Sequence, residues 1–158
     1  MLLEQLNYWI DKTIERHVAL SQSCDCFKSE FLGYFNADFL RKCCFVVTDT
    51  LPFPRLERLY PSEGYSFISN KRFPAVAYKD MYFIHSEYQH DLSVHLHELI
   101  HICQWQLMGI WFLQQCLDEW QDDNGLAPSL EQQAIDISRR YVKGKRPVDV
   151  KSLIYSYI

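Results

Sequence analysis

The sequence has few of the features that mark membrane, secreted or nucleic-acid-binding proteins. Its longest obvious apolar run, residues 107–113, is far shorter than the roughly 20 residues that a membrane-spanning helix needs. The first residues contain Glu4 and Asp11 but no basic opening, which is not the pattern of a secretory signal peptide. With 16 Lys and Arg against 20 Asp and Glu, the chain lacks the excess positive charge that phosphate binding requires. We therefore expect a cytoplasmic protein whose partner is neither a membrane nor a nucleic acid.

Glycine and proline are also scarce, with 5 and 6 residues in a chain of 158. Together with a hydrophobic content of 48%, this composition excludes disordered and fibrous proteins and indicates one globular domain. No internal repeat and no change of composition marks a linker. We expect an N-terminal helix and a small sheet over residues 1–86, helices over residues 87–143 and a C-terminal tail over residues 144–158.

The six cysteines lack the spacing of a structural zinc site. The pairs Cys24/Cys26 and Cys43/Cys44 could supply four thiolates, but paired zinc ligands are usually separated by two to four residues. Adjacent residues of a strand also point to opposite faces, so Cys43 and Cys44 are poorly placed to bind one ion. We expect the cysteines to be reduced and to act as small apolar residues.

The hydrophobic pattern predicts both helices and strands. Apolar residues recur with the helical period over residues 2–19, from about 91 to 115, and again from 129 to 143. The middle segment is apolar nearly all round, which is typical of a buried central helix. Segments rich in β-branched and aromatic residues predict strands at residues 43–48, 65–69, 75–78 and 81–85. We therefore expect an α+β fold, with a small, mostly antiparallel sheet packed on the central helix and other helices flanking it.

The central helix contains the pattern H-E-x-x-H, formed by His97, Glu98 and His101. The two histidines lie one helical turn apart, about 40° from each other around the axis, so both imidazoles can bind one ion. Two neutral imidazoles and a carboxylate suit zinc and leave a fourth position for water. Glu98 lies about 100° round from His97, where it can accept a proton from that water. The competing interpretation, two core histidines bonded to carbonyl groups, is less favoured because polar residues in such a helix need a specific partner.

A third ligand is required, and no histidine follows His101, so the candidates that the sequence offers are acids. We favour Glu131, since a residue in the first turn of the next helix is better preorganised than a loop residue. Ala134, one turn further on, would let the two helices approach closely. The alternatives lie in the acidic segment after the central helix: Asp118, Glu119, Asp122 and Asp123.

The sequences HELIHICQW over residues 97–105 and LEQQA over residues 130–134 resemble the short gluzincin-type zinc metallopeptidase domains. In those domains the pattern H-E-L-x-H-x-x-Q is followed by a helix that contains the pattern E-x-x-A. The resemblance covers residues 81–142 of this chain. It implies a zincin-like fold, Zn²⁺ bound by His97, His101 and Glu131, and Glu98 as the general base. In those domains an Asp often follows the alanine directly. Here Ile135 occupies that position and Asp136 comes one residue later. Asp136 is therefore the candidate for a hydrogen bond that supports His97 or His101.

Several other polar residues are candidates for parts of the site. A donor to the developing oxyanion is needed near the metal, and the sequence does not choose between Tyr141, Arg139, Arg140 and His85. His95 faces another side of the helix and receives no role. Gln104 and Met108 continue the ligand face, and we expect them to line the core or the cleft.

These observations predict a zinc-dependent metallopeptidase that hydrolyses polypeptides with metal-activated water and Glu98 as the base. A substrate strand would pair with an exposed sheet edge, for which residues 81–85 are the candidate. Two alternatives stay open. One is a non-catalytic domain that binds zinc with the same residues, and the other is a protein-interaction module, because an aromatic content of 15% favours binding surfaces.

Overall fold

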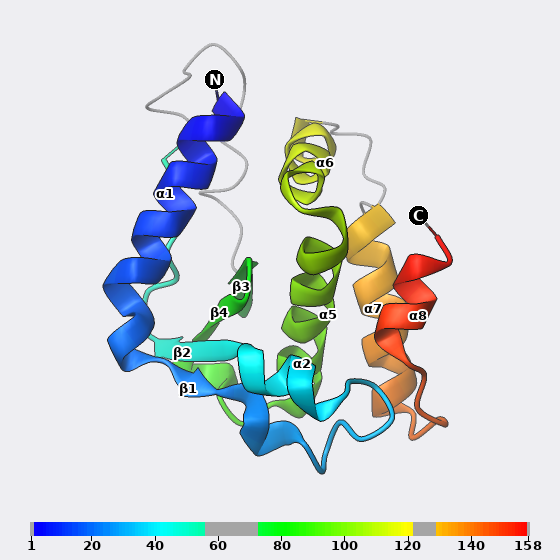
Figure 1. The fold of residues 1–158 in the computed structure, drawn as a ribbon. Coiled ribbons are helices and arrows are strands. Elements are labelled where there is room, and N and C mark those ends of the chain that lie inside the picture. The colour runs from blue at the N-terminus through cyan, green and yellow to red at the C-terminus, as the bar shows by residue number, and fades with distance from the viewer. Residues whose placement is uncertain (1, 56–72, 122–128, 158) are drawn as a thin grey trace.

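The computed structural model describes residues 2–55, 73–121 and 129–157, with only the backbone for residues 119–121. In this part of the chain the fold is α+β, with a four-stranded sheet and six α-helices. Helix α5 (Leu92–Met108) lies in the middle of the molecule (Figure 1). The sheet and α1 (Leu2–His17) lie on one side of it, and α7 (Ser129–Val142) and α8 (Val150–Tyr155) on the other.

The remaining helices are short or lie at the ends of α5. They are α2 (Ala37–Lys42), α6 (Ile110–Gln121) and the 3₁₀ helices η1 (Val18–Leu20), η2 (Cys24–Phe27) and η3 (Ser86–Tyr88). The tail after Gly144 docks on the core through α8, whose Val150 and Ile154 are buried. No helix in the described ranges combines the length and apolar character that a membrane crossing requires.

The sheet is mixed rather than purely antiparallel. Its strands, β1 (Gln22–Ser23), β2 (Cys44–Thr48), β3 (Ala75–Tyr78) and β4 (Met81–His85), lie in the order β1-β2-β4-β3. The β3–β4 pair is antiparallel, as expected, and so is the β1–β2 pair, although the sequence did not predict β1; β2 and β4 run parallel in the centre. The predicted hairpin around Lys79 and Asp80 is confirmed, and the predicted strand at residues 65–69 lies outside the described residues.

The expectation that residues 81–85 form a sheet edge is wrong. β4 lies between β2 and β3, and its residues from Met81 to Ile84 are all buried. Four successive apolar residues bury both faces of a strand, which is the pattern of an interior strand rather than of a half-exposed edge. Within the described residues, β3 forms the edge of the sheet on this side.

The apolar pattern over residues 91–115 corresponds to two helices instead of one. Asp91 begins α5 by accepting hydrogen bonds from the N–H groups of Ser93 and Val94, which satisfies two donors of the first turn. Gly109 ends it, with φ +60° and ψ −137°, a backbone conformation that only glycine adopts without strain. The chain turns there, and α6 leaves in a different direction from α5 (Figure 1).

Helices α5 and α7 pack side by side over most of their length (Figure 1). Ala134 of α7 is fully buried in the core that they share, where its small side chain permits a close approach. Gly144, with φ +64°, ends α7 in the left-handed conformation that stops helices.

Three of the six cysteines lie in the apolar core, whereas Cys26 is exposed and Cys44 and Cys116 are partly buried. All six are free thiols, and Cys24, Cys43 and Cys103 are buried. Burial raises the pKa of Cys103 to about 12, so its thiol stays protonated and uncharged near neutral pH.

Replacement of Gly109 by alanine tests the helix break. A Cβ atom at this position would meet no other atom within 4 Å, so the cost comes from the backbone conformation alone. We expect Gly109→Ala to lower the free energy of unfolding by about 1–2 kcal/mol, measured by urea denaturation. Gln106→Ala, an exposed position of α5, is the control and should change it by less than about 0.5 kcal/mol. Equal stability of both variants would show that the junction does not depend on glycine.

Candidate metal centre

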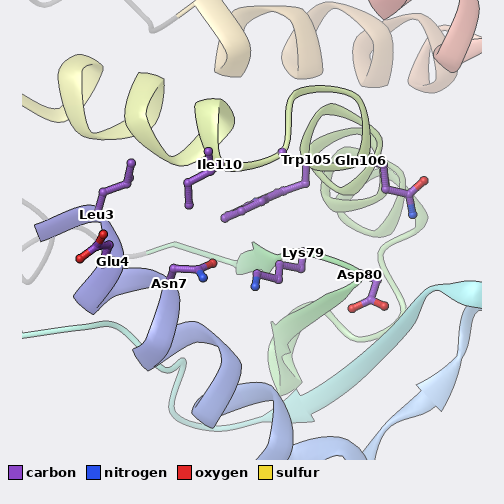
Figure 2. Close-up of a pocket in the computed structure, with 9 residues that line it drawn as sticks. Leu3, Glu4, Asn7, Lys79, Asp80, Trp105, Gln106 and Ile110 are labelled. Carbon is purple, nitrogen blue, oxygen red and sulfur yellow. The ribbon is translucent and has the colours of Figure 1, made fainter. Parts of the chain in front are cut away.

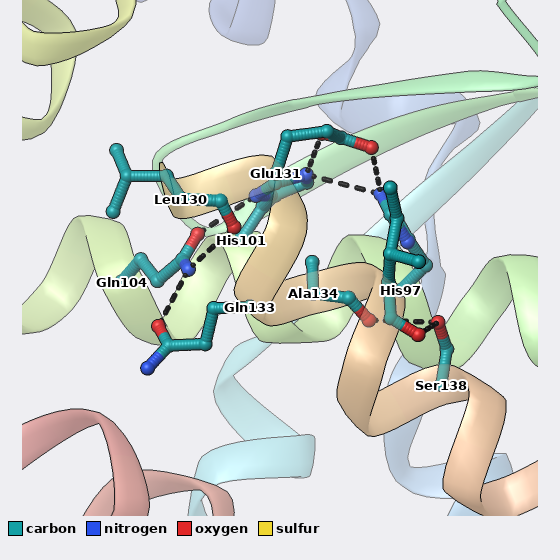
Figure 3. A network of polar contacts seen from close by, with 9 residues as sticks. His97, His101, Gln104, Leu130, Glu131, Gln133, Ala134 and Ser138 are labelled. Carbon is teal, nitrogen blue, oxygen red and sulfur yellow. Dashed lines mark hydrogen bonds and ion pairs between the residues drawn. The ribbon is translucent and has the colours of Figure 1, made fainter. Parts of the chain in front are cut away.

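The structure brings His97, His101 and Glu131 together (Figure 3). Nε2 of His97 lies 2.9 Å from Oε1 of Glu131, and Nε2 of His101 lies 2.9 Å from Oε2 of the same carboxylate. The two ring nitrogens are 3.2 Å apart. Among the described residues, these three form the one group of three or more histidine, cysteine and acidic side chains that could hold a metal ion.

The spacing of these atoms fits a small divalent ion. In a tetrahedral zinc site with bonds of about 2.0–2.1 Å, two ligand nitrogens lie about 3.3 Å from each other. The observed separation of 3.2 Å between the two Nε2 atoms is close to that value. Two imidazole nitrogens and a carboxylate oxygen are also ligands that zinc accepts, so the residues present fit the ion that the sequence implies.

The three groups are strongly coupled electrostatically even without an ion. Burial disfavours the charged form of His101, but its hydrogen bond with Glu131 and the negative charge of Glu98 outweigh this and raise its pKa. Burial disfavours the charged form of Glu131 too, but the hydrogen bonds with His101 and His97 hold its pKa well below the usual range. Glu131 is therefore ionised and ready to act as a ligand, and a metal ion must displace a proton from His101.

Glu98 lies beside the ligands in the same pocket. It is only 4% exposed, and burial raises its pKa, while the neighbouring His101 and His97 oppose that rise. A buried carboxylate with a raised pKa in a cleft is a group suited to accept and return a proton. The arrangement thus combines a candidate ligand set from α5 and α7 with a candidate base on α5.

The pocket around these groups has a volume of about 430 Å³ and mostly apolar walls. All four residues of β3 form one wall, so the edge of the sheet borders the ligand group. Phe112 and Leu113 of α6 and Leu130 of α7 contribute apolar surface on the other side. A cleft with apolar walls and a few convergent polar groups is typical of ligand-binding sites.

Asp136, Tyr141 and His85, which the sequence offered as supporting residues, have other partners. Asp136 is exposed and accepts a hydrogen bond from Gln132 at 2.8 Å. The Nδ1 atom of His85 accepts a hydrogen bond from the N–H of Glu87 at 3.2 Å. Neither side chain lines the pocket of the ligand group.

Tyr141 points away from the site because of its position on α7. Ten residues of helix separate it from Glu131, a rise of about 15 Å. Its hydroxyl donates to Oε2 of Glu30, and its ring packs against Phe31 and Tyr34. Arg139 and Arg140, near the same end of α7, also lie outside the pocket lining.

Asp118 is the one acid of the segment after the central helix whose side chain the structure describes, and it is not a ligand. Asp118 is exposed on α6 and accepts a hydrogen bond from Gln114. The side chain of Glu119, and Asp122 and Asp123, lie outside the described residues. His95, which received no role, is buried away from the ligands and contacts the hydroxyl of Tyr82 and the carbonyl of Gln89.

Gln104 is the residue whose importance the sequence did not reveal. It was expected to line the core or the cleft; its side chain is fully buried and contacts His101, Leu130 and Gln133. Two signals were available: its place in the H-E-L-x-H-x-x-Q pattern, and its spacing, because a residue three positions after His101 lies on the same helical face. A glutamine in an otherwise apolar helix needs partners, and here one of them is a candidate metal ligand.

Trp105 also borders a second hollow (Figure 2). Its volume is about 630 Å³, and it is bounded by α1, the β3–β4 turn and the junction of α5 with α6. Glu4 and Asp80 are its acidic residues, and its lining contains no histidine or cysteine. The metal-ligating chemistry is thus confined to the first pocket in the described part of the chain.

Comparisons of the chain with protein-family models, curated proteins and solved structures find no match. The functional argument therefore depends on the geometry of the residues described above.

Removal of the carboxylate ligand tests the centre directly. We expect Glu131→Gln to weaken zinc binding by more than about 100-fold, because loss of a ligand costs more than loss of an outer hydrogen-bond partner. Competition with a chromophoric chelator measures the affinity. Asp136→Asn, on the exposed face of the same helix, is the matched control and should bind zinc like the unchanged protein. Unchanged zinc affinity in Glu131→Gln, with weaker binding in Asp136→Asn, would show that Glu131 is not the third ligand.

Proposed function

We propose that the protein is a zinc-dependent metallopeptidase. The observation that carries this proposal is the convergence of His97, His101 and Glu131 within one pocket that also contains the buried carboxylate of Glu98. His97 and His101 of α5 and Glu131 of α7 would supply three ligands to a zinc ion, and a catalytic zinc ion takes water or substrate as its fourth. The gluzincin-like spacing of H-E-x-x-H and E-x-x-A supports the same function.

The residues of the chain divide the chemistry between them. An ion held by the three ligands supplies a Lewis acid that polarises a carbonyl group and acidifies a water molecule. Glu98 accepts the proton of the attacking water and returns it to the nitrogen of the leaving amine. Its burial favours this role, because a carboxyl group with a raised pKa is a stronger base than one in water.

The position of Glu98 favours catalysis over a purely structural ion. A structural zinc site closes all four positions with protein ligands and has no use for a free base beside them. Burial of an unpaired ionisable group also costs free energy, and a catalytic role would account for a carboxylate kept at this position.

The substrate is proposed to pair with β3, in place of β4. The N–H of His85 donates to the carbonyl of Pro74 at 2.8 Å, and hydrogen-bonded pairs alternate along an antiparallel ladder. Given the register, Val76 bonds to Phe83, and the backbone groups of Ala75 and Ala77 face away from β4. An extended peptide can add to this edge as a further strand and lie along the wall of the pocket.

Replacement of the base separates catalysis from metal binding. We expect Glu98→Gln to retain zinc and to lose peptide hydrolysis by about 10²–10⁴-fold, because the amide cannot accept the proton of the attacking water. Native mass spectrometry with and without a chelator reports the metal, and a peptide library analysed by mass spectrometry reports cleavage.

The same pair of measurements distinguishes the alternatives. Zinc binding without hydrolysis by the unchanged protein would indicate a non-catalytic metal-binding domain. Absence of zinc from the unchanged protein would leave the protein-interaction module as the remaining alternative. Unchanged hydrolysis by Glu98→Gln would remove Glu98 from the mechanism.

A proline at the edge of the sheet tests the substrate strand. Ala77→Pro removes an N–H that faces away from β4, and proline is tolerated at such positions of edge strands. We expect KM for peptides to rise about 5- to 10-fold, the loss expected for one backbone hydrogen bond, while zinc affinity stays unchanged. Unaltered KM would show that the substrate does not use this edge.

A further inference from the structure

The buried carboxamide of Gln104 joins the two helices that carry the ligands. Its Oε1 lies 2.8 Å from Nδ1 of His101 on α5. Its Nε2 donates to the carbonyl oxygen of Leu130 at 3.1 Å and to Oε1 of Gln133 at 2.9 Å, both on α7. In Figure 3 the amide lies between the ring of His101 and the start of α7. These contacts satisfy an amide whose burial without partners would be costly.

The orientation of this amide follows from the main chain. The carbonyl oxygen of Leu130 can only accept a hydrogen bond, so the end of Gln104 that faces it must be the NH₂ group. The other end is an oxygen, which can only accept, and it faces Nδ1 of His101. That ring nitrogen must therefore carry a hydrogen, which leaves the lone pair of the neutral ring on Nε2, the atom beside Glu131.

We propose that Gln104 is a positioning residue that holds His101 in the Nδ1–H tautomer and aims its Nε2 at the metal. This inference rests on the proposed metal site. The carbonyl that orients the amide belongs to Leu130, the residue directly before Glu131. One side chain therefore fixes the ring of one ligand and the helical turn that presents another, although the two lie on different helices.

The first test removes the hydrogen bonds of Gln104 and keeps its bulk. Gln104→Met retains a side chain of similar length, so the apolar packing around it is largely preserved. We expect the zinc affinity of the full chain to fall about 10- to 100-fold, measured by chelator competition on protein whose circular dichroism shows the native fold. Gln106→Met, at an exposed position of the same helix, is the matched control and should leave the affinity unchanged.

A second variant separates the two ends of the amide. Gln104→Glu still offers an acceptor to Nδ1–H but no donor to the carbonyl of Leu130. In ¹H NMR spectra of the zinc-loaded protein, we expect an imidazole N–H signal protected from solvent exchange in the unchanged protein and in Gln104→Glu. We expect this protection to be lost in Gln104→Met. A role in packing alone would not produce this pattern.

The outcomes separate this inference from the proposed function. Equal zinc affinity and equal N–H protection in Gln104→Met and in the unchanged protein would overturn the positioning role. If Gln104→Met does not fold, loss of the protected N–H in Gln104→Glu would overturn it instead. Zinc binding without peptide hydrolysis by the unchanged protein would overturn the peptidase proposal alone and leave the role of Gln104 intact.

Discussion

The contact between α5 and the first turn of α7 is the interaction on which the candidate site depends. Two histidines on one helix are a frequent local arrangement, but they need a third group to form a metal centre. Glu131 reaches both Nε2 atoms because the helices lie close together, and the fully buried Ala134 permits that approach. The ligand set therefore exists only in the packed state, in which the sheet and α8 also pack against α5.

The sequence predicted the structure best where the spacing of residues close together in the chain decides their positions. The separation of His97 and His101 by four residues places them on one helical face wherever that helix lies. Glu131 was selected among several acids because a helical turn holds a ligand better than a loop, and the structure brings it to the histidines. The β3–β4 hairpin followed from two apolar segments separated by a two-residue turn.

The features that the sequence did not predict depend on long-range contacts. Gly109 lies within a continuous apolar pattern, and only the positive φ of the folded chain shows that α5 ends there. The interior place of β4 comes from its parallel pairing with β2, a strand distant in sequence. Tyr141 shares a helix with Glu131 but contacts Glu30, because the length of α7 separates the two ends. The sequence marked Gln104 by its spacing and by its place in the H-E-L-x-H-x-x-Q pattern, but its partners Leu130 and Gln133 lie on α7 and depend on the packing of the two helices.

The location of Glu131 in the first turn of α7 has an electronic consequence. The N-terminus of a helix carries a partial positive charge from its aligned peptide dipoles, which stabilises a nearby carboxylate. The helix dipole thus partly offsets the negative charge of Glu131, and the carboxylate would be a weaker electron donor to a coordinated cation. A cation in this centre would therefore keep more of its own charge, and the proposed reaction needs such a charge to polarise a carbonyl group.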